Sequence, residues 1–272
     1  MTANSATAAP ETRLRPPGWL RLALEMRMPW ELGASLLALP LLRSQPRGDG
    51  HAVLVFPGLV ASDTSTAPLR RYLTDLGYDA RAWELGRNLG PGRGVLEACF
   101  AKVREVHAET GGKVSLIGWS LGGIYAREAA KVAPECVRCV ITLGTPFAGH
   151  PKATNAWRVY EMASGERADS RIPRQRLAEA PPVPTTSIYS RTDGVVAWQC
   201  SVERSARWDT ENIEVDSSHV GLGVHPAALY AIADRLAQVE GAWRPFDRTS
   251  PCRRFFFPDP AAPDRTASTP LF

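Results

Sequence analysis

Short apolar runs recur along the chain, and helical patterns separate most of them. Runs rich in valine, isoleucine and leucine without polar alternation are typical of strands that are buried on both faces of a sheet. The predicted strands are Ala52–Phe56, Asp79–Leu85, the run that begins at Val114, Val137–Leu143, Thr186–Ser190 and Asn212–Val215. The predicted helices are Thr66–Leu76, Gly94–His107, Leu121 to about Ala133, and Pro226–Val239. This alternation predicts an α/β fold, with a mostly parallel central sheet and helices on both faces.

Proline and glycine indicate where several of these helices begin and end. Pro68 fits the first turn of the helix over Thr66–Leu76, and Gly77 is placed to close that helix. Pro134 ends the helix that begins at Leu121, because proline cannot continue a helix at that position.

The chain before the first strand divides into two parts. Residues 1–15 are small and polar, lack the basic start and apolar core of a signal peptide, and are expected to be disordered. Residues 16–50 form a predicted helical arm, with one or two helices between Pro17 and Leu42. The second half of this arm is apolar nearly all round, so we expect it to be buried against the domain. A hairpin that faces lipid is the alternative, although arginines interrupt the first helix on a regular face.

Residues 51–241 form the predicted main domain. Within it, residues 147–184 have no strong strand signal, and we interpret them as a small helical lid with a helix over Ala153–Ala163. The tail, residues 242–272, is rich in proline, arginine and phenylalanine and shows no periodicity. Its run Phe255-Phe256-Phe257 is expected to pack back on the domain, with a membrane contact as the alternative.

Charge and cysteine content narrow the classes of partner and compartment. The formal net charge is +4 at pH 7 and the charged residues are scattered, so no nucleic-acid partner is expected. Five cysteines, mostly in apolar settings, make no disulfide framework and favour a reducing, cytoplasmic location. Cys136 and Cys139 form a C-x-x-C, but a strand would point them to opposite faces, so no zinc or redox site is predicted there. No apolar run is long enough to span a bilayer, which leaves peripheral contact through the arm as the membrane alternative.

A G-x-S-x-G pattern stands between the central strand and the next helix, as Gly118-Trp119-Ser120-Leu121-Gly122. A bare match arises by chance in roughly one such chain in ten, so the flanking elements decide its meaning. Strand, sharp turn and helix form the setting of a nucleophile elbow, in which the serine occupies a strained backbone conformation. The residues two before and two after the serine approach each other closely, which requires glycine at both places. Ser120 is therefore the predicted nucleophile.

A serine nucleophile needs two backbone N–H donors for the negative charge that develops on the carbonyl oxygen. The strand Ala52–Phe56 runs directly into Pro57-Gly58-Leu59-Val60, a turn tight enough to place such a donor. We predict that Leu59 supplies one N–H and that Leu121, at the start of the helix after the serine, supplies the other. An ordinary strand-to-helix loop is the alternative for the first turn.

The chain offers five histidines as candidates for the general base. We favour His219, because it lies beyond the final predicted strand among small polar residues that leave it exposed. The favoured acid is Asp193, at the carboxyl end of the preceding strand and along the same edge of the sheet. The alternatives are His150 and His225 for the base, and Asp209 and Asp216 for the acid.

The order Ser120, Asp193, His219 along the chain is that of the α/β-hydrolase family. The region from about Ala52 to Val239 resembles that family. Its stretches Gly-Trp-Ser-Leu-Gly-Gly and Leu-Gly-Thr-Pro-Phe-Ala-Gly are similar to those of bacterial lipases and esterases. Pro57 stands where many members have the histidine of a His-Gly-x stretch, and the arm and tail lie outside the resemblance.

These observations together predict a serine esterase or lipase that cleaves carboxylic esters through an acyl-enzyme, without a metal or organic cofactor. Trp119, Phe147 and Trp157 are the candidates for a pocket that suits an apolar acyl or alcohol part of a small-molecule ester or lipid. An acyltransferase or thioesterase that uses the same triad is one alternative. A non-catalytic binding module on the same fold is another, since fold alone does not determine function.

Overall fold

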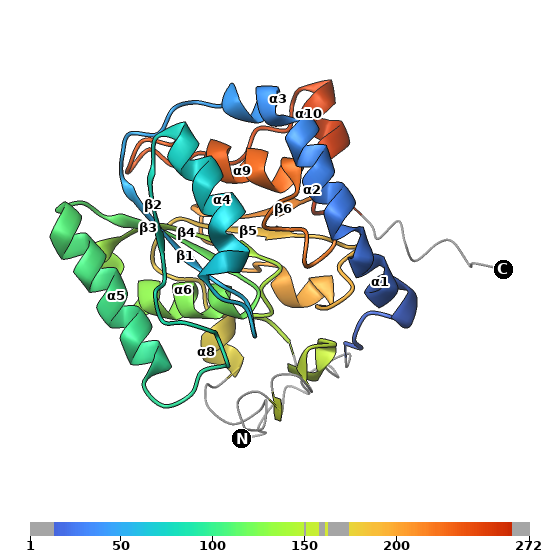
Figure 1. Ribbon diagram of the computed structural model, residues 1–272, viewed down its shortest axis with the longest axis horizontal. Coiled ribbons are helices and arrows are strands. Elements are labelled where there is room, and N and C mark those ends of the chain that lie inside the picture. The colour runs from blue at the N-terminus through green and yellow to red at the C-terminus, as the bar shows by residue number, and fades with distance from the viewer. Residues whose placement is uncertain (1–13, 150, 158–160, 163–173, 263–272) are drawn as a thin grey trace, which may run out of the picture.

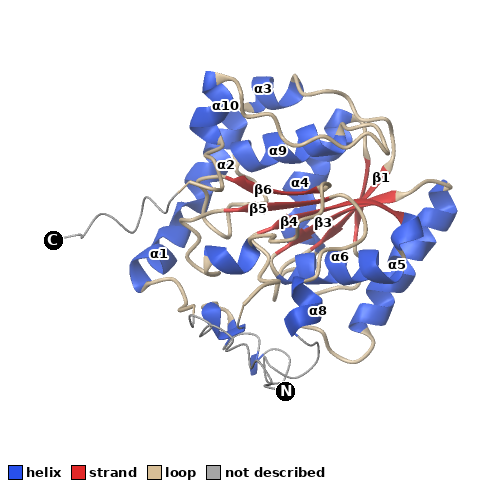
Figure 2. Cartoon of the chain, turned by 180° about the vertical axis from the view of Figure 1, so that it is seen from behind, coloured by secondary structure: helices blue, strands red, loops and turns tan. Residues whose placement is uncertain are grey.

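A computed structural model of the chain describes residues 14–149, 151–157, 161–162 and 174–262. One parallel sheet lies at its centre, with the strand order β2-β1-β3-β4-β5-β6 (Figures 1 and 2). The strands are β1 (Ala52–Phe56), β2 (Asp79–Ala82), β3 (Val114–Trp119), β4 (Val137–Leu143), β5 (Thr185–Tyr189) and β6 (Thr210–Glu214). Each predicted strand is confirmed, although β2 ends at Ala82, before the predicted Leu85.

Helices cover both faces of this sheet, which confirms the predicted α/β architecture (Figure 2). The covering helices are α4 (Asp63–Leu76), α5 (Val95–Thr110), α6 (Leu121–Val132) and α9 (Pro226–Leu236). Strand β1 shows how one apolar run serves two cores: Val53 and Val55 pack beneath α4 and α9, whereas Leu54 and Phe56 pack beneath α5 and α6. Successive side chains of a strand point to opposite faces, so a strand between two helical layers is apolar throughout.

Helix α4 begins three residues earlier than predicted, at Asp63, so the prediction that Pro68 lies in its first turn was wrong. The carboxylate of Asp63 accepts the backbone N–H groups of Trp83 and Glu84, at 3.2 and 3.3 Å, and a negative charge is favourable in the first turn of a helix. Gly77 closes the helix as predicted, in the left-handed conformation with φ of 101°.

The N-terminal arm consists of four short helical segments, whereas one or two helices were predicted. The segments are α1 (Trp19–Ala23), the 3₁₀ helix η1 (Leu24–Arg27), α2 (Met28–Leu37) and α3 (Leu39–Arg43). The prediction that the apolar second half is buried was wrong for most of its side chains, although Leu42 is buried in the core. The buried side chains of α2 are the polar Glu31 and Ser35, while Trp30 and Leu37 are more than 80% exposed. Helix α2 therefore contacts the domain through polar residues, whereas α3 contacts it through the apolar Leu42.

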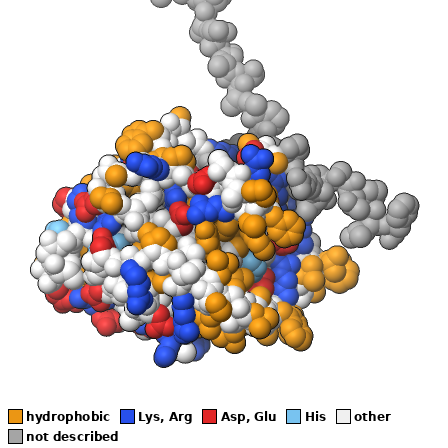
Figure 3. Space-filling model, turned by 90° about the horizontal axis from the view of Figure 1, so that it is seen from above, with side chains coloured by type: hydrophobic (Ala, Val, Ile, Leu, Met, Phe, Trp, Pro, Cys, Tyr) orange, Lys and Arg blue, Asp and Glu red, His pale blue; other side chains and the backbone are white. Residues whose placement is uncertain are grey.

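The outward side of the arm carries a row of exposed apolar side chains, which we call the arm's apolar face. Its members are Trp19, Leu20, Leu22, Leu24, Met26, Trp30, Leu36, Leu37 and Leu41. Viewed from above, hydrophobic side chains gather over the side of the molecule along which the arm runs (Figure 3). None of the helices in the described ranges is both long and apolar enough to traverse a membrane.

The described part of the tail after α9 contains a short helix that its lack of periodicity did not predict. This helix is α10 (Pro251–Phe256). Phe257 is buried and its ring lies 4.7 Å from that of Phe246, so the tail packs back on the domain as expected at this residue. Phe255 and Phe256 are exposed, so the expectation does not hold for them.

The other short helices of the described residues lie in loops between the main elements. They are η2 (Pro134–Cys136), η3 (Pro151–Ala153), α8 (Arg174–Ala178) and η4 (Trp198–Ser201). Two of them, η3 and α8, belong to the predicted lid over residues 147–184, and residues 158–160 and 163 of the predicted helix Ala153–Ala163 lie outside the described residues.

Candidate active site

Ser120 occupies the sharp turn between β3 and α6 with φ of 53° and ψ of −122°, a conformation that costs roughly 1–3 kcal/mol for a non-glycine residue. The turn is closely packed. A Cβ atom at Gly118 would stand 2.2 Å from the Cα of Gly123, and one at Gly122 would stand 2.3 Å from the carbonyl oxygen of Phe56. Only glycine fits at these two positions, so the turn has the geometry that the motif predicted for a nucleophile elbow.

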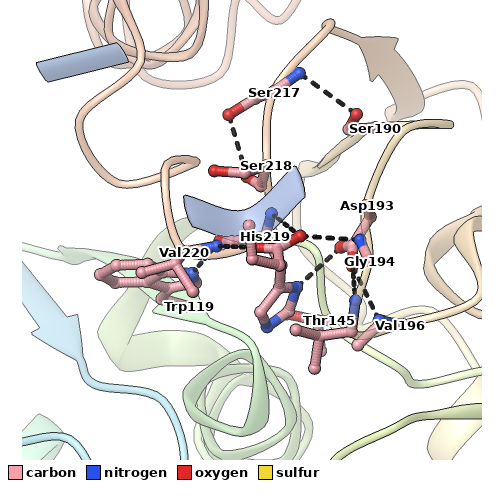
Figure 4. A network of polar contacts seen from close by, with 12 residues as sticks. Trp119, Thr145, Ser190, Asp193, Gly194, Val196, Ser217, Ser218, His219 and Val220 are labelled. Carbon is pink, nitrogen blue, oxygen red and sulfur yellow. Dashed lines mark hydrogen bonds and ion pairs between the residues drawn. The ribbon is translucent and has the colours of Figure 1, made fainter. Parts of the chain in front are cut away.

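Asp193 and His219 form a hydrogen bond of 2.7 Å between Oδ2 and Nδ1, although 26 residues separate them in the sequence (Figure 4). Asp193 follows β5 and His219 follows β6, so the two side chains meet at the carboxyl edge of the sheet. The other oxygen of Asp193 accepts the N–H groups of Val195 and Val196, at 2.8 and 2.7 Å. These two bonds set the carboxylate so that Oδ2 faces the imidazole. Both side chains are buried, whereas exposure was expected for His219.

The alternatives for the acid and the base take other parts in the structure. Asp209 is paired with a neighbouring arginine at 2.6 Å, and Asp216 accepts a hydrogen bond from a threonine hydroxyl at 2.7 Å. The Nδ1 atom of His225 accepts a backbone N–H at 3.2 Å and caps α9. His150 lies outside the described residues.

Ser120 and His219 both lie at the carboxyl ends of the strands, and their neighbours in sequence contact each other. The indole N–H of Trp119 donates to the carbonyl oxygen of His219 at 3.0 Å (Figure 4), and the N–H of Ser120 donates to the carbonyl of Leu143 at 2.8 Å. The next residue, Gly144, lies so close to the ring that a Cβ there would stand 3.0 Å from Nδ1 of His219. Within the described residues, the Ser120 hydroxyl makes no hydrogen bond to the imidazole. Such bonds are often long in ligand-free sites and tighten when substrate binds.

The turn after β1 lies directly beside the serine. A Cβ at Gly58 would stand 3.3 Å from the Cβ of Ser120, and Val60 is held in the left-handed region with φ of 55°. This conformation is unusual for a β-branched residue, and such strain concentrates at functional turns. The N–H groups of Leu59 and Leu121, the predicted oxyanion donors, donate to no other group in the part of the chain that the structure describes. Both N–H groups are therefore available to a ligand.

A buried asparagine holds this turn in place. Asn88 donates from its side chain to the carbonyl of Pro57 at 2.9 Å, and its backbone bonds to Val60 and Ala61 at 2.7 and 2.8 Å. Its amide oxygen accepts the hydroxyl of Tyr125 on α6 at 3.0 Å, so one side chain joins the turn to the helix after Ser120. The sequence analysis missed this residue. Its only signal is a polar side chain within the glycine-rich loop over 86–94.

The three aromatic residues predicted to line the pocket lie in different surroundings. Trp119 is half-buried, and its ring packs against Gly223, where an added Cβ would stand 3.0 Å from the ring. Phe147 is buried beneath the guanidinium of Arg127, which lies 3.8 Å from the ring centroid. Trp157 is half-buried in the lid, with the ammonium of a lysine 5.5 Å from its ring. Among the three, Trp119 is the one that contacts His219 directly.

Charge around the imidazole favours its protonated form. Burial lowers the pKa of His219, because a charged ring loses hydration there, but the Asp193 carboxylate and Glu25 oppose this effect and the net pKa is raised. The ring therefore accepts a proton more readily than a free histidine does.

The described residues include no group of three or more histidine, cysteine, aspartate or glutamate side chains that could hold a metal ion. The thiol of Cys139, one half of the C-x-x-C, instead contacts the hydroxyl of Ser115 at 3.4 Å.

Comparison with curated proteins finds short but close matches, and no family model matches the chain. Over 62 residues it is 52% identical to a triacylglycerol lipase of Pseudarthrobacter phenanthrenivorans, which is 22% of this chain and 19% of that protein. A triacylglycerol lipase of Burkholderia plantarii is also 52% identical over 62 residues, 22% of this chain and 17% of that protein. The chain thus spans less than a fifth of the length of the curated relatives it matches.

Solved structures of α/β hydrolases share the fold over most of this chain. Lipase B of Aspergillus fumigatus gives a TM-score of 0.53 at 19% identity, covering 73% of this chain and 56% of the lipase. An α/β-hydrolase enzyme from a lagoon-sediment metagenome gives a TM-score of 0.52 at 19% identity, covering 69% of this chain and 90% of the enzyme. A monoacylglycerol lipase of Paleococcus ferrophilus gives a TM-score of 0.50 at 15% identity, covering 70% of this chain and 96% of the lipase. The chain has the α/β-hydrolase fold and is similar to bacterial lipases and esterases, as its motifs implied.

We predict that Asn88→Ala lowers the free energy of unfolding by about 1–3 kcal/mol, because it leaves the buried Pro57 carbonyl and Tyr125 hydroxyl without this partner. Urea denaturation followed by tryptophan fluorescence measures the loss. Gln45→Ala is the control, since that amide makes one exposed bond of 3.2 Å and its loss should cost less than about 0.5 kcal/mol. Equal small effects for the two variants would contradict the role given to Asn88.

Proposed function

We propose that this chain is a serine hydrolase of carboxylic esters, of the esterase or lipase type, with Ser120, His219 and Asp193 as its triad. The observation that supports it most is the 2.7 Å bond between Asp193 and His219 at the sheet edge where Ser120 occupies its strained turn. A triad is recognised by geometry and by the part each group plays, and here the serine, the acid and the base come from the loops after β3, β5 and β6.

The reaction proceeds in two halves. The Nε2 atom of His219 takes the proton of the Ser120 hydroxyl while its oxygen attacks the ester carbonyl, and Asp193 on Nδ1 keeps the ring in the required tautomer. The N–H groups of Leu59 and Leu121 stabilise the oxyanion, each contributing roughly 3 kcal/mol. His219 then protonates the leaving alcohol. Water activated by the same ring releases the acyl group, and none of these steps needs a cofactor.

The substrate we propose is a small-molecule ester or lipid with an apolar part. The curated relatives are named triacylglycerol lipases, and the half-buried ring of Trp119 adjoins the proposed base. Aromatic walls favour an apolar acyl or alcohol group over a charged one.

We predict that a fluorophosphonate probe labels the purified protein at Ser120, and that Ser120→Ala abolishes both labelling and turnover of p-nitrophenyl esters. Loss of a triad serine costs up to about 10⁶ in kcat. Ser65→Ala is the matched control, because that hydroxyl donates to the carbonyl of Ser62 at the start of α4. Normal turnover by a folded Ser120→Ala protein would end the proposal. Labelling without hydrolysis, together with transfer to an added alcohol or thiol, would favour the acyltransferase alternative.

We predict that kcat/KM for a short p-nitrophenyl ester falls on the acid side with an inflection above about 6.5, the ordinary value for histidine. The sign follows from the raised pKa of His219: only the neutral ring acts as a base, so activity is lost as pH falls through that raised value. Asp193→Asn should lower kcat by about 10⁴. A wild-type profile without an inflection, or with one below the ordinary value, would contradict His219 as the base.

We also propose that the arm's apolar face rests on the surface of aggregated lipid during catalysis. Trp19 and Trp30 are about 80% exposed, and tryptophan favours the boundary between water and acyl chains. The arm contacts the loops that carry Asp193 and His219, so a lipid surface under this face would lie next to the site.

We predict that Trp19→Ser combined with Trp30→Ser weakens binding to phosphatidylcholine–phosphatidylglycerol vesicles, measured by co-sedimentation, by about 30-fold, because about 2 kcal/mol of interfacial burial is lost. Turnover of a water-soluble ester should be unchanged. Trp208→Ser is the matched control. That side chain is 71% exposed but precedes β6, so it lies at the amino ends of the strands, whereas the arm contacts the loops at their carboxyl ends. Equal binding by all three proteins would contradict the docking surface.

A further inference from the structure

A single carboxylate of the arm binds both loops of the candidate site. The Oε1 atom of Glu25 accepts the N–H of Gly194 at 2.7 Å and the N–H of His219 at 2.9 Å. Its Oε2 atom accepts the N–H of Val220 at 2.9 Å. Gly194 directly follows Asp193, so Glu25 joins the backbone next to the acid to the backbone of the base.

The arm approaches these loops as closely as backbone allows. A Cβ at Gly194 would stand 2.2 Å from the carbonyl oxygen of Arg21, so no other residue fits beneath α1. In the close view, the ribbon of the arm passes beside His219 and the labelled Gly194 (Figure 4). The arm is therefore in direct contact with the loop that carries the acid.

A second carboxylate reinforces the contact further along the arm. Glu31 accepts the N–H of Ser218 at 2.6 Å, and a Cβ at Gly221 would overlap its Oε2 atom. Arg27 links this group to the acid loop, since it donates to Glu31 at 3.0 Å and to the hydroxyl of Thr192 at 2.6 Å. The residues on both sides of Asp193 and His219 are thus held from the arm.

We propose that Glu25 is a positioning residue, which sets the separation of the Asp193 and His219 loops by accepting backbone N–H groups from both. This inference rests on the proposed function, in which those two side chains act as acid and base. An ionised carboxylate suits the task because it accepts several hydrogen bonds and makes each of them stronger than a neutral acceptor would. Glutamine at this position would offer one acceptor oxygen and place an NH₂ group against an N–H donor.

Glu25 also acts on His219 through its charge. The charged groups that act on the imidazole are Asp193 on the acid loop and Glu25 on the arm. Arg27, Glu31 and Asp216 lie further along the contact between the arm and these loops, where Arg27 pairs with both carboxylates. Glu25 is among those that raise the pKa of His219. Removing its charge should therefore lower that pKa, an effect that a purely structural contact would not produce.

The test is Glu25→Gln in the full-length protein, assayed with a soluble p-nitrophenyl ester. We expect kcat to fall by about 10- to 100-fold with KM nearly unchanged, because charge-assisted bonds to the base loop are lost. The acid inflection of kcat/KM should move to lower pH. Glu25→Asp, which keeps the charge on a shorter side chain, should restore the inflection and part of kcat. Glu97→Gln, an exposed carboxylate on α5, is the matched control and should change neither.

An NMR titration of the His219 ring, assigned with His219→Gln, separates failure of this inference from failure of the proposed function. A lower ring pKa in Glu25→Gln supports the positioning role even if the wild type hydrolyses no ester. An unchanged ring pKa together with unchanged kcat, in a protein that unfolds cooperatively, would overturn it. If Glu25→Gln does not fold, the wild type is compared with Glu25→Asp instead. We then expect a lower kcat at constant KM in Glu25→Asp. An unchanged kcat would overturn the positioning role.

Discussion

The hydrogen bond between Asp193 and His219 depends on groups that hold each side chain from outside the pair. Two N–H groups from the residues after Asp193 orient its carboxylate. The indole of Trp119 holds the carbonyl of His219, while Glu25 holds its N–H. A buried carboxylate and imidazole lose hydration when they fold together, so their pairing is favourable only where the remaining polar atoms also find partners. The site is therefore a connected set of hydrogen bonds that extends into the arm.

Much of this molecule could be predicted from the pattern of its sequence. Strands buried on both faces produce apolar runs that no amphipathic helix shares, which is why β1, β3 and β4 were located almost to the residue. The serine turn was equally clear, because the backbone contacts at Gly118 and Gly122 leave no room for any side chain and so restrict the sequence itself. Asp193 and His219 followed from a geometric rule: loops after parallel strands gather at one edge of the sheet.

The residues that were missed depend on tertiary contacts that have no local signature. Asn88 is a polar residue in a glycine-rich loop, and only the fold brings it against Pro57 and Tyr125. The burial of His219 was missed for the same reason, because the arm that covers its loop lies almost 200 residues earlier in the chain. The start of α4 was misplaced since Asp63 is anchored by the backbone of residues 83 and 84. Propensity and periodicity describe only what a segment contributes by itself.

The arm shows most clearly how a partner decides which face of a helix is buried. Hydrophobic patterning assumes that the partner is an apolar core, and under that assumption the leucines and the tryptophan of α2 should point inward. Here the partner is the polar backbone of the loops after β5 and β6, whose N–H groups face outward from the carboxyl ends of the strands. Burying leucine against those donors would leave them unsatisfied, at a cost of about 1–3 kcal/mol each, so the carboxylates of Glu25 and Glu31 take the inner positions instead. The apolar side chains are left on the outer side by the same constraint. Thus one set of unsatisfied backbone donors explains the buried carboxylates, the glycines at 194 and 221 that admit them, and the exposed apolar face beside the candidate site.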